Sequence, residues 1–175
     1  VGAKPGPAYG ERFFQRTLDL IEKYHPDLLS FDDPVLPLNG VSDVGLRLAA
    51  DFYNADRPWH AGRLEAVLNT QGLNEAQRRC LVWDIERGTP AGIEPYPWQI
   101  DTSIGNWAYQ RSLFEQRRYK SPETVIHMLA DIVSKNGNLL LNIPLRGDGT
   151  LDGAEAAFLE VMTAWMKVNG EAIFG

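Results

Sequence analysis

The stretch that decides the fold is YHPDLLSFDDP, residues 24–34. A short apolar run, Leu28–Phe31, stands between Pro26 and a pair of carboxylates, Asp32 and Asp33. Runs of this kind, bounded by turn residues, are typical of strands that are fully buried in a parallel sheet. In α/β barrels the catalytic groups follow the C-terminal ends of such strands, where the two aspartates stand. The alternative, that both aspartates only solvate a loop or cap the next helix, stays open at this point.

The length, charge and composition of the chain limit the classes of partner that it can have. The chain has 175 residues, 44% of them hydrophobic, which is enough for one domain with a sizeable core. The net charge of −6 argues against a nucleic-acid partner, and with no apolar run of membrane-span length we expect no membrane partner. Cys80 is the single cysteine, so no disulfide can form within the chain. The five Trp and six Tyr point to a sugar, because these rings often line sugar-binding clefts, although core packing accounts for about half of the aromatic residues.

Helix-type and strand-type patterns alternate along the chain and predict an α/β fold with a parallel sheet. The spacing of apolar residues and caps predicts helices over Glu11–Tyr24, Asp43–Asn54, Asn74–Arg79 (short and polar) and Asp152–Asn169, and one more that opens at Ser121-Pro122-Glu123. In that helix we expect His127 to be a packing residue and Gly137 to hold the C′ position. The predicted strands are Leu28–Phe31, Leu64–Leu68, Leu81–Trp83 and Asn138–Ile143, and residues 88–103 are interpreted as a long aromatic loop.

Several classes of catalytic and cofactor-binding motif are absent from the sequence. The sequence has no phosphate-binding glycine loop, no dinucleotide fingerprint and no nucleophile elbow. The three histidines are too far apart for metal-ligand spacing, so we expect neither a metal nor a cofactor. Carboxylates at strand ends remain: Asp32 and Asp33 after one predicted strand, Asp84 and Glu86 after another. Two carboxylates on neighbouring strand ends are what glycoside hydrolysis needs, one to attack the anomeric carbon and one to act as acid and base.

Several motifs together carry a resemblance to a known family. They are YHPDLLSFDD at residues 24–33, VWDIERG at 82–88, PWQIDTSIG at 97–105, VSKNGNLLLNIP at 133–144, GDGT at 147–150 and NGEAIFG at 169–175. In this order the chain resembles the α-L-fucosidases of glycoside hydrolase family 29. The resemblance spans nearly the whole chain. It implies a retaining hydrolase of terminal α-L-fucosidic bonds, built on a (β/α)8-like barrel and acting on a fucosylated glycan or a small fucoside.

The resemblance also implies roles for individual residues. Asp32 matches the family's nucleophile, and Glu86 is the best match to the general acid/base, with Glu94 as the competitor in the same loop. Trp98 matches a tryptophan that lines the fucose pocket. Asp33, Glu94 and Trp107 complete the candidate substrate-binding set. Two positions depart from the family pattern: Ser30 replaces an aromatic residue of many relatives, and Gln71 stands about where some relatives carry a sugar-binding arginine.

The family's N-terminal half, with its sugar-binding histidines, has no counterpart here. We therefore expect residues 1–175 to form one domain, the C-terminal half of a partial (β/α)8 TIM-like barrel, whose partner is the missing N-terminal half. The chain alone should then self-associate through its unpaired sheet edges, and it should show no fucosidase activity, because the missing half would also supply sugar-binding groups. Two alternatives stay open, a non-catalytic carbohydrate-binding protein and a half-barrel assembly unit. The family resemblance implies a periplasmic, secreted or lysosomal location.

Overall fold

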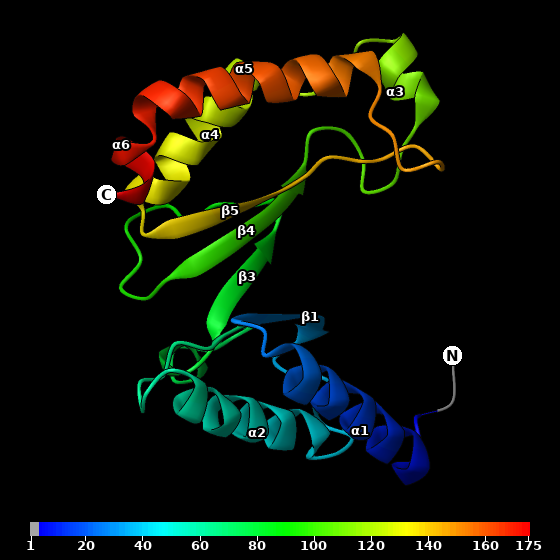
Figure 1. The fold of residues 1–175 in the computed structure, drawn as a ribbon, viewed down its shortest axis with the longest axis vertical. Helices are drawn as coiled ribbons and strands as arrows, with labels where there is room; N and C mark the ends of the chain where they lie inside the picture. The colour runs from blue at the N-terminus through cyan, green and yellow to red at the C-terminus, as the bar shows by residue number, and fades with distance from the viewer. Residues whose placement is uncertain (1–3) are drawn as a thin grey trace. The chain divides into compact units, whose positions relative to one another are not determined.

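The computed structural model describes residues 4–175 and divides them into two compact units, one ending at Asp84 and one beginning at Ile85. Figure 1 shows the elements of both. The first unit contains α1 (Pro7–Tyr24), β1 (Leu28–Pro34), α2 (Val44–Trp59), β2 (Val67–Gln71) and the short 3₁₀ helix η1 (Gln77–Arg79), and β3 (Val82–Glu86) crosses the boundary. The second unit contains β4 (Trp98–Ser103), α3 (Arg111–Glu115), α4 (Pro122–Ser134), β5 (Gly137–Asn142), α5 (Gly153–Asn169) and α6 (Glu171–Phe174).

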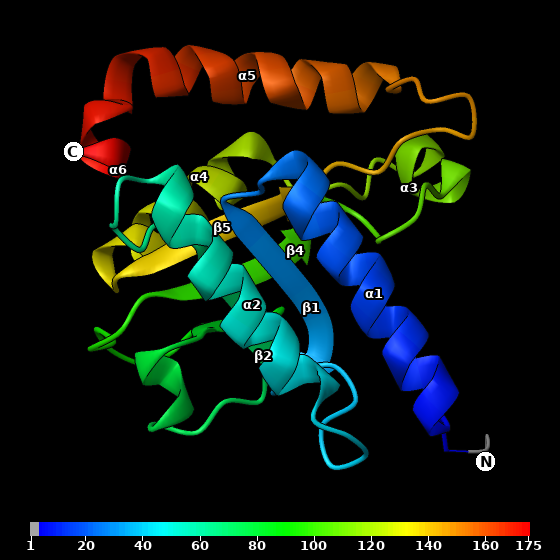
Figure 2. The same cartoon turned by 60° about the horizontal axis from the view of Figure 1, so that its bottom comes forward.

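Parallel strands form the framework of the first unit. Leu28 of β1 pairs with Val67 of β2, and Asn69 of β2 pairs with Val82 of β3, in both cases in parallel. Helices α1 and α2 lie side by side and cover one face of β1 and β2 (Figure 2). The predicted α/β fold with parallel strands is confirmed.

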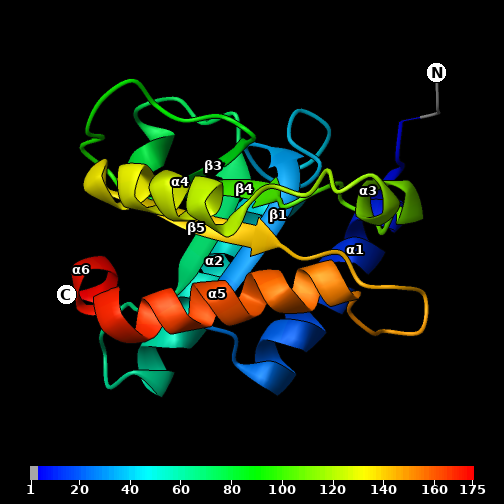
Figure 3. The same cartoon turned by 90° about the horizontal axis from the view of Figure 1, so that it is seen from above.

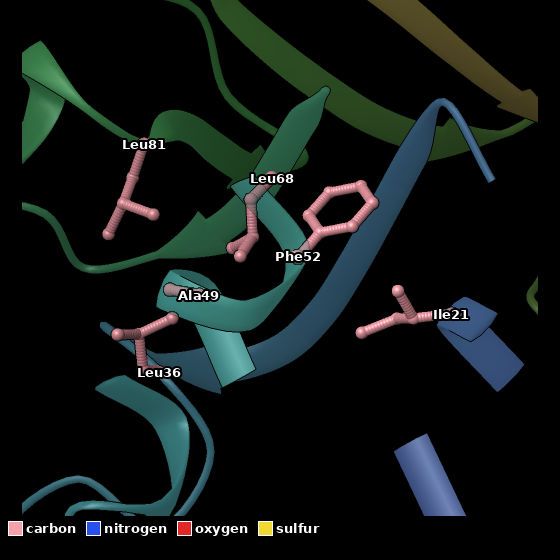
Figure 4. Close-up of a cluster of buried hydrophobic side chains, with 6 residues drawn as sticks. All are labelled: Ile21, Leu36, Ala49, Phe52, Leu68 and Leu81. Atoms are coloured by element: carbon pink, nitrogen blue, oxygen red, sulfur yellow. The ribbon is translucent and has the colours of Figure 1, made fainter. Parts of the chain in front are cut away.

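The core of this unit joins residues from each layer. Ile21 of α1, Phe52 of α2 and Leu68 of β2 are each at most 1% exposed. Burying a side chain of this size stabilises a fold by roughly 1.5–3 kcal/mol. Figure 4 shows them with the other members of the same cluster: Ile21, Leu36, Ala49, Phe52, Leu68 and Leu81.

Both helices are longer than their apolar spacing predicts. α1 begins at Pro7 rather than Glu11, because proline suits the first helical turn, where no N–H bond is needed. α2 continues past Asn54 to Trp59 and includes Pro58 in its last turn. There the Trp59 ring stacks on His25, the left-handed residue that ends α1, with ring centres 3.9 Å apart.

The expectation that β1 is fully buried is wrong. Leu29 and Phe31 pack against the helix-side core, whereas Leu28 is 47% exposed and Ser30 is exposed. Successive side chains of a strand point to opposite faces, and the helices of the first unit, α1 and α2, cover only one face of β1. The strand also continues through Asp32 and Asp33 to Pro34 instead of ending before them.

A buried aspartate explains why β2 begins at Val67 and not at Leu64. The Asp56 carboxylate is fully buried at the end of α2 and accepts the Glu65 N–H at 2.7 Å. Burial opposes ionisation of Asp56, but the backbone N–H groups of Glu65 and Ala66, together with His60, outweigh it and lower its pKa. These two N–H groups therefore serve the carboxylate rather than a strand pair.

The second unit contains a strand that the sequence did not reveal. Residues 98–103, interpreted as part of a loop, form β4, which pairs in parallel with β5 from Trp98↔Gly137 to Ser103↔Asn142. Its side chains alternate, with Trp98, Ile100 and Thr102 on one face and polar residues on the other. The polar half of this alternation concealed the strand, so the chain has five described strands instead of the expected four.

Helices α4 and α5 cover the same face of β5 and lie side by side (Figure 3). α4 starts as predicted, with the Ser121 hydroxyl accepting the Thr124 N–H at 3.1 Å. Asp152 and Glu155 form a capping box that opens α5. The short helices α3 and α6 were not expected, and the predicted helix Asn74–Arg79 is reduced to η1.

Two expectations about α4 are wrong. His127 is exposed rather than packed. The left-handed residue after the helix is Asn136, with φ of 66°, while Gly137 is already the first residue of β5. Gly137 is required for space instead, since a Cβ there would lie 2.5 Å from the indole ring of Trp98.

We expect Gly137→Ala to destabilise the protein by about 1–3 kcal/mol, because its methyl group would displace the fully buried Trp98 ring. Urea unfolding of this variant measures the change. Gly147→Ala is the matched control, since a Cβ at Gly147 meets no atom within 4 Å. Equal unfolding midpoints for the two variants would contradict the packing argument.

Candidate active site

In the first unit, the candidate nucleophile lies beside the end of a neighbouring strand. Asp32 is exposed, and its Oδ1 accepts a hydrogen bond of 2.6 Å from Nε2 of Gln71, the last residue of β2. Asp33 is also exposed, and its backbone oxygen accepts the Thr70 hydroxyl at 2.7 Å. The structure therefore places the Asp32 side chain at the C-terminal edge of the strands and fixes one of its oxygens.

Gln71 also controls the path of the chain beyond Asp32. Its backbone oxygen accepts the Val35 N–H at 2.8 Å. Val35 is left-handed, with φ of 69°, and the β1–β2 register shifts between Phe31 and Pro34. A β-branched residue rarely adopts such a φ, and strain of this kind concentrates at functional sites. Gln71 is thus a site residue to which the sequence assigned no role here.

In the second unit, the structure brings Glu86 and Trp107 together. Glu86 is the exposed last residue of β3, and its Oε1 accepts a hydrogen bond of 3.1 Å from the Trp107 indole nitrogen. The ring of Trp107 is 39% exposed, and the guanidinium carbon of Arg87 lies 4.8 Å from its centre. A carboxylate and an accessible indole ring therefore share one surface, as a sugar-binding carboxyl site requires.

The ends of β4 and β5 hold Trp107 in this position. Asn142, the last residue of β5, donates from Nδ2 to the backbone oxygen of Trp107 at 3.2 Å and to Oγ of Ser103 at 3.1 Å. Ser103, the last residue of β4, donates its hydroxyl to the backbone oxygen of Asn106 at 2.8 Å. The polar ends of two paired strands thus position the loop that reaches Glu86. In the sequence, the only feature that could have identified Ser103 and Asn142 as site residues is that each is a polar residue at the end of a strand.

Glu94 lies at the other end of these strands. Its N–H donates to the Lys135 backbone oxygen at 3.2 Å, and its own backbone oxygen accepts from Asn136 at 3.2 Å. Both partners directly precede Gly137, where β5 begins. Glu94 therefore belongs to the N-terminal edge of the β4–β5 pair, away from Glu86 and Trp107.

The interpretation of Trp98 as a sugar-binding surface is wrong. Trp98 is 1% exposed, and its indole nitrogen donates to the Lys135 backbone oxygen at 2.9 Å. A ring enclosed by protein cannot stack on a sugar. The related signal in the sequence was Gly137, which makes room for the ring.

Comparison with known proteins identifies the family. A family model described as alpha-L-fucosidase matches residues 2–171. This chain belongs to the α-L-fucosidase family. It is 35% identical to plasma alpha-L-fucosidase of Homo sapiens over 91 residues, which cover 51% of this chain and 19% of that protein. It is 32% identical to tissue alpha-L-fucosidase of Macaca fascicularis over an alignment of 182 positions, gaps included, which covers 99% of this chain and 35% of that protein.

Solved structures agree with this assignment. The crystal structure of Thermotoga maritima alpha-fucosidase aligns with a TM-score of 0.75 and 26% identity, covering 97% of this chain and 36% of that one. The catalytic domain of these relatives is a (β/α)8 barrel. The chain spans about a third or less of the length of the fucosidases described here.

Within residues 4–175, no three His, Cys, Asp or Glu side chains are grouped so that they could hold a metal ion. No helix in this part of the fucosidase chain combines the length and apolar character needed to cross a membrane.

Proposed function

We propose that this chain supplies both catalytic carboxyl groups of a retaining α-L-fucosidase. The observation that carries the proposal is that, in a member of this family, Asp32 and Glu86 each stand exposed at a strand's C-terminal end and accept a side-chain N–H. Asp32 attacks the anomeric carbon of a terminal α-L-fucoside and forms a covalent fucosyl-enzyme. Glu86 protonates the departing glycosidic oxygen and then removes a proton from the water that releases fucose.

Neighbouring side chains orient these two groups. The Gln71 amide holds one oxygen of Asp32, which leaves the other oxygen for attack along a defined direction. The Trp107 indole holds Oε1 of Glu86, which leaves Oε2 to carry the proton. Trp107 also offers an accessible ring to the apolar side of fucose. Asp33 is available for a substrate hydroxyl. The position of Glu94 favours Glu86 as the acid/base.

The proposed substrate is a fucosylated glycan or a small fucoside. In support, one structure of the Thermotoga maritima relative, 26% identical to this chain, is a complex with fucose. Curated relatives are named plasma and tissue fucosidases, which supports a secreted or lysosomal location, and the periplasm remains the third candidate. A catalytic protein is favoured over a pure binding module, because a binding module needs neither carboxyl group.

We further propose that other parts of a barrel cover the exposed strand faces in the natural protein. Leu28 of β1 is 47% exposed and Leu140 of β5 is 51% exposed, on strands whose opposite faces are packed against helices. Apolar strand residues at such exposure favour burial against further protein. The expected need for an N-terminal half is consistent with this.

We expect Asp32→Ala to reduce hydrolysis of an aryl α-L-fucoside by roughly 10⁴-fold or more in the natural protein, because the nucleophile is lost. Added azide should restore part of the turnover and yield a fucosyl azide, identified by mass spectrometry. Asp33→Ala is assayed in parallel. Near-normal turnover by Asp32→Ala, with the loss and the azide rescue appearing in Asp33→Ala, would move the role to Asp33.

We expect Glu86→Ala to slow fucosides with poor leaving groups by about 10²–10⁴-fold and activated aryl fucosides far less, because only the former need a proton donor. The dependence of kcat on the pKa of the leaving group measures this. Glu94→Ala is the matched control and should retain the parent's dependence, given its place at the N-terminal edge. The reverse pattern would transfer the role to Glu94.

Trp107→Phe keeps an aromatic ring but removes the N–H that holds Glu86. We expect kcat for poor leaving groups to fall about tenfold, the typical effect of losing a hydrogen bond to a charged group, with little change in KM. A ring that only binds sugar would instead change KM for all fucosides alike. Trp165→Phe, a change of the same kind on α5, serves as the control.

A further inference from the structure

A cavity of about 470 Å³ lies in the second unit between β4, α4 and the connection that follows β3. Glu86 is not among its lining residues, so it is separate from the proposed acid/base. We call it the Arg87–Lys120 pocket. Its polar lining comes from Arg87, Thr89, Thr102, Lys120, His127 and Asp131, and its apolar lining includes Ile100 and Met128.

The two cations of this pocket have no carboxylate partner among the residues that the structure describes. The Lys120 amine donates to the backbone oxygen of Ser103 and to the Thr102 hydroxyl, and Arg87 lies against a ring. Asp131 does line the pocket, but it is bound to Lys135 at 2.8 Å. Unpaired cations here are notable in a chain whose net charge is −6.

These cations act on each other. Partial burial lowers the pKa of Lys120, and the positive charge of Arg87 lowers it further. Two like charges that face one cavity destabilise each other, and an anion bound between them would remove that cost. Arg87 is moreover left-handed, with φ of 53°, a conformation that arginine rarely adopts and that turns it out of β3. Strained backbone of this kind is frequent where a side chain is held for binding.

We propose that the Arg87–Lys120 pocket binds an oxyanion group of the sulfate or phosphate ester type, carried on a sugar. Arg87 and Lys120 supply charged N–H donors, and Thr89 and Thr102 supply hydroxyl donors. The volume exceeds the need of a free ion and falls in the range of small-molecule pockets. The half-buried Met128 offers apolar surface to the face of the attached sugar ring. The proposal is independent of the catalytic roles proposed above.

The test is isothermal titration of the protein with galactose 6-sulfate, galactose and inorganic sulfate, at ionic strength held constant with sodium chloride. We expect saturable binding of galactose 6-sulfate and none of galactose. Arg87→Met should weaken binding of the sulfated sugar at least about tenfold, since one charged donor is lost. Arg118→Met, which removes an exposed arginine outside the pocket, should bind it as the parent does.

Lys120→Met is the second variant, checked by circular dichroism because the Lys120 amine also supports the Ser103 backbone. If it is unfolded, Arg87→Met decides alone. If inorganic sulfate binds as tightly as galactose 6-sulfate, the pocket binds a free oxyanion, and the proposal that the oxyanion is carried on a sugar is wrong. The proposal as a whole fails if no sulfate compound binds above the chloride background, or if Arg87→Met and Arg118→Met bind equally well.

Discussion

The parallel pairing of β4 with β5 is the interaction on which the rest of the second unit depends. It runs in unbroken register from Trp98↔Gly137 to Ser103↔Asn142. Because both strands end together, the polar side chains of Ser103 and Asn142 meet and hold the loop that carries Trp107. A shift by one residue would turn each of these side chains to the opposite face of the strand. The position of Trp107, whose indole N–H binds the carboxylate of the proposed acid/base, is therefore set by strand register.

In the first unit, too, a polar residue at a strand end holds a candidate catalytic carboxylate in place. Gln71 ends β2 and fixes both the Asp32 side chain and the Val35 backbone. An amide is neutral, so it orients the Asp32 carboxylate without cancelling its charge, whereas an arginine at this place would neutralise it. This arrangement suits a group that must attack a developing positive centre, because the negative charge stays available.

The spacing of apolar residues in the sequence predicted those elements that are held by apolar packing. Apolar residues at helical spacing located α1, α2, α4 and α5, and the carboxylates after two apolar runs located both candidate catalytic residues. The strand β4 was missed because Gln99 and Ser103 are buried polar residues, and a sequence does not show that their hydrogen-bond partners exist. Trp98 was misassigned for a related reason: whether a tryptophan packs or binds depends on Gly137, which is distant in sequence and adjacent in space.

The connection between β3 and β4 has a further consequence. It runs through residues 87–97 and contains no helix that could cover β4. The helix-side face of β4 near Thr102 is therefore left for Lys120 and the side chains of α4, which enclose a cavity instead of a packed core. Arg87 begins this connection directly after Glu86, so the proposed acid/base and one of the two unpaired cations are neighbours in sequence. One short, helix-free connection thus accounts for both an exposed carboxyl group and an open, positively charged pocket.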